Sequence, residues 1–228
     1  MSISTIIKKR ITTKNWNDIP LEQHKIDYIL DCATNAPSKQ SLYNYRIVVL
    51  GNSEKAIDVK TWLFQSDTWC DNKGNRLGKA STMRNYNGQY KAPLVLVWLQ
   101  KEQDYNKSNT NKKLKRHQTQ ETDLVDITVS ASFAMLAAEE QSLQTGFGRC
   151  HGVTELAKKL GYSGSRAELV LGIGYGTDHS LSDNHDKLIV YNKKGNMMGY
   201  NDKNIPADAP GVKRRANKPT MEELIHYY

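Results

Sequence analysis

The segment Pro93-Leu94-Val95-Leu96-Val97-Trp98-Leu99 (PLVLVWL) is the clearest strand in the sequence. It is rich in β-branched and aromatic residues, which fit the pleated surface of a sheet. The segments 45–50 and 168–173 have the same character, and we expect the first of them to be buried. The sequence therefore predicts three strands that are well separated along the chain.

Helical patterns lie between and around these strands. Apolar spacing and capping residues indicate helices over residues 2–9, 18–34, 53–65, 123–143, 153–160 and 220–226. The helix at 123–143 is the strongest, and its small residues would allow a partner subunit to pack closely on it. We expect one of its faces to carry Val125, Val129, Ser132, Phe133, Leu136 and Ala137. Because helices and strands are interleaved and no linker divides the chain, residues 1–228 are expected to form one layered α+β or α/β domain.

The segment 101–120 is strongly polar and dense in Lys, Asn and Gln. An exposed loop is the simplest interpretation. A lid over a site and a nucleic-acid patch are the alternatives. Tyr105 is the only aromatic residue of this segment, which weakens the nucleic-acid alternative because single-strand recognition relies on base stacking.

The composition narrows the class of protein. Lys and Arg number 32 against 24 Asp and Glu, a formal charge of +8 that permits an anionic partner such as nucleic acid, a membrane surface or a phosphorylated cofactor. The three cysteines, Cys32, Cys70 and Cys150, form neither a disulfide framework nor a zinc pattern. The sequence shows no signal-peptide core and no run near the ~18 apolar residues of a membrane span. We expect a cytoplasmic protein with reduced thiols.

Three motifs do not support the kinds of site that their residue types suggest. Gly172-Ile-Gly174-Tyr-Gly176 lacks the spacing of a dinucleotide-binding loop and follows the last strand instead of the first. The segment 179–186 (HSLSDNHD) has metal-ligand residue types but no helical pair of histidines, so a solvated loop is preferred. Cys150 and His151 are adjacent in sequence, and adjacent residues seldom orient each other for nucleophilic catalysis.

The segment Lys9–Trp16 (KRITTKNW) is basic, and its adjacent threonines disfavour a helix interior. In an extended segment alternate side chains share a face. One face then carries a cation, a hydroxyl and a cation, from Arg10, Thr12 and Lys14, whereas Ile11 and Thr13 point the other way. Such a face suits phosphate, although a solvated basic segment is the alternative. A second basic cluster at 213–215 would either close around the same anion or remain solvated.

Three segments together resemble the nitroreductase-like flavoproteins, which bind FMN. Arg10–Trp16 is similar to the N-terminal basic–x–hydroxyl–x–basic–x–aromatic signature of that family. Ala36–Ser41 matches its Ala-Pro-Ser segment, which lies between a helix and a strand. The helix after Asp126 and the segment 144–150 resemble its central helix and the loop that follows. The glycine-rich segment at 172–175 and the basic tail also fit, so the resemblance covers nearly the whole chain.

The resemblance implies a layered α+β fold with a central, mostly antiparallel sheet surrounded by helices, in an intertwined homodimer with FMN at the interface. It further implies NAD(P)H-driven reduction of nitroaromatic, quinone or similar electron-poor acceptors, by ping-pong hydride transfer through flavin N5. No catalytic side chain is implied, because FMN carries the chemistry. Neither nucleic acid nor a membrane would be a partner.

The resemblance also assigns cofactor-binding residues. The phosphate and ribityl chain would be held by Arg10, Ile11, Thr12 and Lys14, together with Lys213 or Arg215. The second subunit would contribute Pro37, Ser38, Lys39 and Ser41. The flavin ring would be approached by Asn85 and by a backbone loop of Gly148, Arg149 and Cys150.

The sequence departs from the family at several of these positions. Ser41 stands where the family usually has Asn, Tyr43-Asn44-Tyr45 replaces a Gln-Pro-Trp-type segment, and Gly88 stands where some members have Lys. Two alternatives remain: a flavoprotein of the same fold with different chemistry (dehalogenase, flavin destructase or dehydrogenase), and a basic nucleic-acid-binding protein.

Overall fold

The computed structural model describes residues 2–66, 88–101, 120–148, 153–177, 189–191, 197–200 and 212–213. The chain forms two compact units, one of Met1–Ala80 with Tyr86–Asp178 and one of Ser81–Asn85 with His179–Tyr228. The single domain expected over 1–228 stays a prediction. Residues 102–119 and the helix expected at 220–226 lie outside the described residues.

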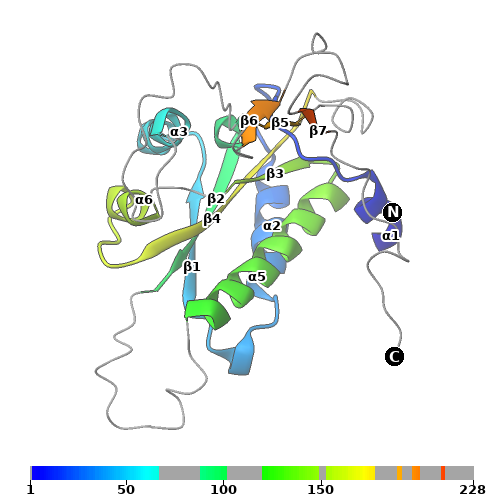
Figure 1. Ribbon diagram of the computed structural model, residues 1–228. Coiled ribbons are helices and arrows are strands. Elements are labelled where there is room, and N and C mark those ends of the chain that lie inside the picture. Colours follow the sequence, from blue (N-terminus) through cyan, green and yellow to red (C-terminus); the bar gives the residue numbers. More distant parts are fainter. Residues whose placement is uncertain are drawn as a thin grey trace, which may run out of the picture. The chain divides into compact units, whose positions relative to one another are not determined.

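The larger unit is built on a four-stranded sheet (Figure 1). Its strands are β1 (Tyr45–Leu50), β2 (Leu94–Gln100), β3 (Gln144–Gly148) and β4 (Arg166–Gly174). They lie in the order β1-β2-β4-β3, and every neighbouring pair is antiparallel. The three strands expected from the sequence and the antiparallel sheet are confirmed. The expected burial of β1 is correct only in part, because β1 is an edge strand in which Arg46 and Val49 are exposed.

The middle strand β2 is buried on both faces, which explains its unbroken apolar sequence. Leu94, Leu96 and Trp98 belong to a core shared with α2 (Gln23–Thr34) and α5 (Gln120–Glu140). The intervening Val95, Val97 and Leu99 belong to a second core, shared with α3 (Glu54–Ser66) and α6 (Val153–Lys159). Helices therefore cover both faces of the sheet, as Figure 1 shows.

The short helices form where the sequence predicts them, with one difference at the start of α2. Helix α1 (Ile3–Lys9) is capped by the Ser2 hydroxyl, which accepts a hydrogen bond from Thr5 N at 3.3 Å. Helix α6 is followed by Gly161 with φ +86°, a conformation that glycine adopts without strain. Helix α2 begins at Gln23 and not near Asp18, because Asn17 N donates to Tyr175 O at 2.7 Å and holds the preceding backbone beside the sheet.

Helix α5 is confirmed, and the face expected to carry Val125 and Phe133 is not the one that packs in the core. Val125 is 60% exposed and Phe133 is 41% exposed. The buried residues are mostly small: Asp123, Asp126, Ile127, Ser130, Ala131, Ala134, Ala137 and Ala138. Alanine and serine let α2 approach the helix closely, so a face of low hydrophobicity becomes the packed one.

The strand β3 and the smaller unit were not predicted. Gly146 and Gly148 were expected to lie in a loop after the long helix, yet both belong to β3. The smaller unit contains a three-stranded antiparallel sheet of β5 (Ile189–Tyr191), β6 (Met197–Tyr200) and β7 (Val212–Lys213), in the order β6-β5-β7. Within the described part of the chain, no helix is both long enough and apolar enough to cross a membrane.

Candidate functional site

The N-terminal segment Arg10–Asn17, which follows α1, lies as an extended strip along the sheet. Thr12 forms a parallel bridge with Thr145 of β3, and Thr13 N donates to Thr145 O at 2.9 Å. Further along, Trp16 forms an antiparallel bridge with Gly176, just beyond β4. Hydrogen bonds at both ends therefore fix the extended backbone that the sequence predicts.

The side chains of the strip alternate as expected. Ile11 and Thr13 are buried against the protein. Thr12 is exposed, and Arg10 and Lys14 are half-buried. The outward face therefore presents a guanidinium, a hydroxyl and an ammonium group within five residues, and Ile11 lies on the opposite face.

A carboxyl group of α5 lies behind the strip. Thr145 Oγ1 donates to Glu139 Oε1 at 2.8 Å, so Glu139 is bound to the same residue that pairs with Thr12. Burial raises the pKa of the Glu139 carboxyl, while the Thr145 hydrogen bond and the positive charge of Arg10 act in the opposite direction. The charge of Glu139 partly offsets that of Arg10.

Glycines on one face of β3 and β4 make room for a short helical turn, η2 (Gly88–Lys91). A Cβ atom on Gly172 would lie 2.1 Å from Gln89 O, and one on Gly146 would lie 2.7 Å from Gln89 Cγ. Gly148 and Gly174 point to the same face, toward Tyr90 and Pro93. Gly172 and Gly174, at the end of β4, thus serve close packing in this structure.

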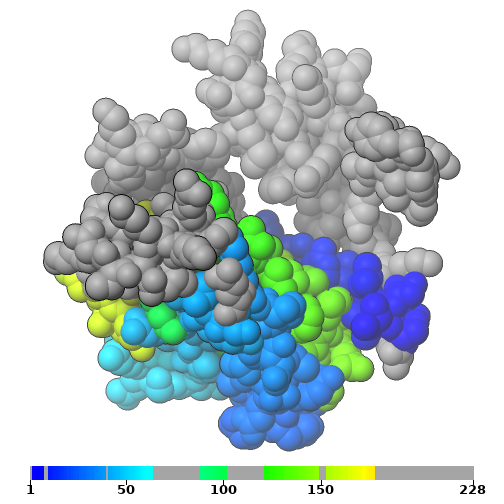
Figure 2. Space-filling view, turned by 90° about the horizontal axis from the view of Figure 1, so that it is seen from below, coloured from blue at the N-terminus to red at the C-terminus, as the bar shows by residue number. Residues whose placement is uncertain are grey.

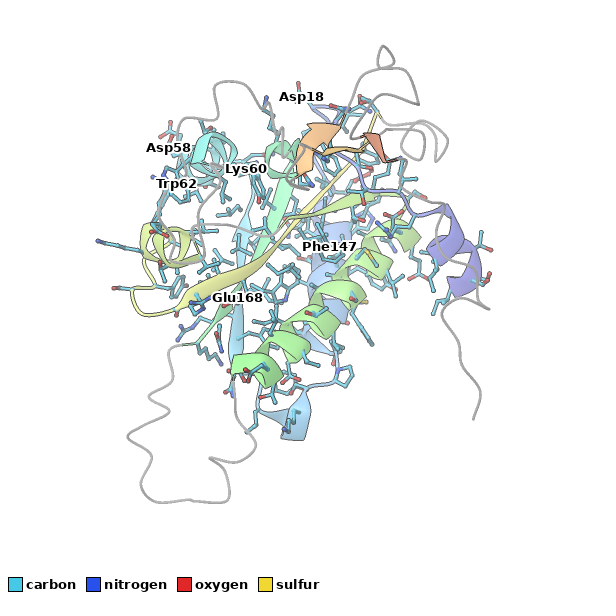
Figure 3. The ribbon with its side chains drawn as sticks, in the orientation of Figure 1. Asp18, Asp58, Lys60, Trp62, Phe147 and Glu168 are labelled. Carbon is cyan, nitrogen blue, oxygen red and sulfur yellow. The ribbon has the colours of Figure 1, made fainter. Side chains whose placement is uncertain are left out.

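The turn η2 is bonded to both the sheet and the strip. Gln89 Nε2 donates to Phe147 O at 3.0 Å, and Trp16 Nε1 donates to Gly88 O at 2.8 Å. Figure 3 shows Phe147 on β3, with its side chain toward the side of the sheet where α5 lies. A Cβ atom on Gly88 would lie 2.0 Å from Lys14 O, so no other residue fits at position 88 while the strip is in place.

The segment Pro37–Ser41 is anchored at the other end of α5. Lys39 N lies 3.0 and 3.1 Å from the two carboxylate oxygens of Asp126. Pro37, Lys39 and Ser41 are exposed, and the turn η1 (Lys39–Ser41) ends with Ser41 at φ +55°. Because Asp126 and Glu139 are thirteen residues apart on one helix, this segment and the strip are separated by about 20 Å along α5.

The structure thus brings Arg10, Thr12 and Lys14 together and sets the 37–41 segment apart from them. Gly148, expected in a loop, is the last residue of β3 and is buried against Tyr90. Four expected site residues lie outside the described residues: Asn85, Arg149, Cys150 and Arg215. Lys213 belongs to β7, and only its backbone is described.

Asp126 and Glu139 were not assigned to the site from the sequence. Both carboxylates lie on the inner side of a helix whose buried face consists mainly of small residues. Carboxylates rarely lie on such a face unless they have a partner, and their spacing with these small residues was the available signal in the sequence. Among the described residues, no group of three or more His, Cys, Asp and Glu side chains is placed to hold a metal ion. The segment 179–186 lies outside those residues.

Comparison with known proteins identifies the family. The profile of the nitroreductase family matches residues 7–177. An FMN-dependent nitroreductase from Clostridium difficile R20291 has a similar structure, with a TM-score of 0.52, 22% identity, and coverage of 78% of this chain and 92% of that one.

Two further solved structures share the fold. The nitroreductase NfrA1 from B. subtilis aligns with a TM-score of 0.58 and 14% identity over 78% of this chain and 68% of that one. A putative NADH oxidase from Clostridium acetobutylicum aligns with a TM-score of 0.54 and 19% identity, over 77% and 89% of the two chains. No curated protein sequence matches. The family profile spans three quarters of this chain, and the solved structures share its fold. The chain therefore belongs to the nitroreductase family.

Proposed function

We propose that the protein is an FMN-dependent oxidoreductase. It would act as a homodimer that takes electrons from NAD(P)H and passes them to a small electron-poor acceptor such as a nitroaromatic or a quinone. The family match and the FMN-dependent relative from Clostridium difficile support the cofactor. The relative described as a putative NADH oxidase supports a nicotinamide donor.

The outward face of the strip is the observation that carries this proposal. Arg10 offers a planar fork of N–H donors, Thr12 a hydroxyl and Lys14 an ammonium group, and this donor set fits a phosphate. A charge-assisted hydrogen bond to phosphate contributes about 1.5–3 kcal/mol. The residues present therefore fit the phosphate end of FMN.

The separation of the two predicted segments supports a dimer. About 20 Å along α5 lies between the anchor of the 37–41 segment and the strip, so one chain does not bring both to one small ligand. A partner subunit would supply the 37–41 segment to the FMN held by the strip. Each site would then contain residues of both chains.

The exposed face of α5 supports the same arrangement. Leu124, Val125 and Phe133 are exposed apolar residues on this helix. Figure 2 shows the α5 surface between those of α1 and α2. Large apolar side chains that one chain leaves exposed are often covered at a subunit interface.

The chain's own residues would bind and orient the reactants. Arg10, Thr12 and Lys14 would hold the phosphate, with Lys213 or Arg215 as a further cation. Asn85 and the backbone at 148–150 would face the ring. The chemistry that bound FMN supplies is two-electron transfer between a donor and an acceptor.

The visible absorption spectrum of the purified protein, after incubation with FMN and gel filtration, tests this proposal. We expect flavin bands in the wild type. The variant Arg10→Ala/Lys14→Ala should lose about 10²-fold or more in FMN affinity, because two charge-assisted contacts are removed. The control Lys55→Ala/Lys158→Ala removes two exposed cations from α3 and α6 and should keep wild-type affinity.

A colourless wild type would refute the cofactor assignment. A double variant that retains full FMN affinity would refute the role of the strip. Oxidation of NAD(P)H by the loaded enzyme with a nitroaromatic acceptor then separates a nitroreductase from a protein of the same fold with other chemistry.

A further inference from the structure

The segment from Ser38 to Asn44 has a backbone that requires external support. Ser41 and Tyr43 have φ angles of +55° and +46°, in the left-handed region that residues other than glycine rarely adopt. Such conformations persist where the surrounding structure fixes them. Most of the segment's side chains are exposed or half-buried, so its own apolar packing does not fix it.

Two buried carboxylates of α5 provide that support. Both oxygens of Asp126 lie within hydrogen-bonding distance of Lys39 N, at 3.0 and 3.1 Å. One turn earlier, Asp123 Oδ1 accepts from Asn44 Nδ2 at 3.2 Å, and Asp123 Oδ2 accepts from Gln100 Nε2 at 3.1 Å. The two carboxylates therefore hold both ends of the strained segment.

The burial of Asp126 indicates a specific role. Its side chain is 6% exposed, and a carboxylate in such a position is unfavourable unless it is hydrogen-bonded. Its carboxylate accepts from the main-chain amide of an exposed residue, Lys39, and not from another core side chain. Asp126 is thus a buried anchor for a segment whose side chains point outward.

We propose that Asp126 is a positioning residue, which holds Ser38, Lys39 and Ser41 in the conformation that contacts FMN bound by the partner subunit. This inference rests on the proposed function, because the contact between this segment and FMN is part of that proposal. The carboxylate acts through the Lys39 amide and does not touch the cofactor.

Three variants separate positioning from general stability. Asp126→Ala removes the acceptor for Lys39 N, and Asp126→Asn keeps one oxygen that can accept. The control is Ser130→Ala, one turn further along α5. Ser130 accepts from Trp98 Nε1 at 3.0 Å and donates to Ala33 O at 2.8 Å, so its loss leaves a buried N–H unpaired but does not touch the 38–44 segment.

FMN dissociation constants and hydrogen exchange of the Lys39 amide in FMN-free protein are measured for each variant. We expect Asp126→Ala to weaken FMN binding about tenfold or more and to accelerate Lys39 exchange by a similar factor. Asp126→Asn should restore most of the FMN affinity and most of the protection of the Lys39 amide. Ser130→Ala should lower the unfolding midpoint while FMN affinity and Lys39 exchange stay near wild type.

The inference is overturned if Asp126→Ala and Ser130→Ala weaken FMN binding equally, or if Asp126→Asn fails to rescue. A wild type that binds no FMN is a different result, because it refutes the proposed function. Lys39 exchange in Asp126→Ala would then still decide whether Asp126 holds the segment.

Discussion

Replacing Gly172 with alanine should displace η2 from the sheet. The added Cβ atom would lie 2.1 Å from Gln89 O and 3.0 Å from the Cβ atom of Ala92. Ordinary van der Waals contact begins near 3.4 Å, so the overlap with Gln89 O is about 1.3 Å. Neither neighbour can relieve it by rotating a side chain, because one is a main-chain oxygen and the other an alanine.

The expected cost follows from this rigidity. Overpacking a core commonly costs 1–3 kcal/mol, and an overlap with main-chain atoms lies at the upper end, so we expect about 3 kcal/mol. For a chain of this size 1 kcal/mol shifts the melting temperature by roughly 2–4 °C, which predicts a decrease of about 6–12 °C. FMN binding should weaken as well, because η2 holds Trp16 of the strip through Gly88 O.

Thermal and urea unfolding followed by circular dichroism would measure the effect. The matched control is Gly51→Ala, because a Cβ atom there would meet nothing within 4 Å. That substitution should be neutral, or stabilising by about 0.4–1 kcal/mol through the unfolded chain. If Gly172→Ala melts at or above the wild-type temperature, the inference that η2 packs too closely on β4 to admit a side chain at position 172 is refuted.

Three further predictions concern single positions. Burial raises the pKa of Glu139 above its ordinary 4.5, so the folded state binds this proton more tightly, and the stability gained from it is lost as pH rises through the folded pKa. In urea unfolding, Glu139→Gln should therefore be as stable as the wild type below pH 4.5 and more stable than the wild type above the folded pKa of Glu139. A difference in unfolding free energy that stays constant from pH 4 to 8 would contradict this. Ser41→Gly should stabilise the protein by about 0.5–1 kcal/mol by relieving a φ of +55°, whereas Ser38→Gly, at φ −126°, should destabilise it by a similar amount in the same assay. Phe133→Asp should give monomers by sedimentation velocity, while Ile57→Asp, at a similarly exposed position on α3, should leave the proposed dimer intact; two dimeric variants would argue against α5 as the interface.

Local patterns in the sequence predicted much of the fold and the alternation of side chains in the N-terminal strip. The apolar run of β2 and the alternation of Arg10, Thr12 and Lys14 depend only on neighbouring residues and on a period of two. Both therefore appear directly in the sequence. Residue order alone also located most of the helix boundaries, because capping residues act within a few positions.

Features that depend on distant contacts were missed. Strand β3 contains two glycines, and glycine has no strand preference. The strand forms because it pairs with β4, and its glycines leave room for η2 to pack closely on the sheet. The buried face of α5 consists mainly of alanine and serine, whose contribution lies in close packing and not in hydrophobicity. Asp126 and Glu139 gain their roles from Lys39 and Thr145, which are distant or on another element.

The attachment of the N-terminal strip also has a consequence for the order of folding. Thr12 pairs with a residue about 130 positions later in the chain, and Trp16 pairs with one later still. Closing such long loops is entropically unfavourable until β3 and β4 have already paired and offer an edge. The strip is synthesised before β3 and β4 but is therefore expected to reach its native place after them, so that the proposed phosphate site is completed late in folding.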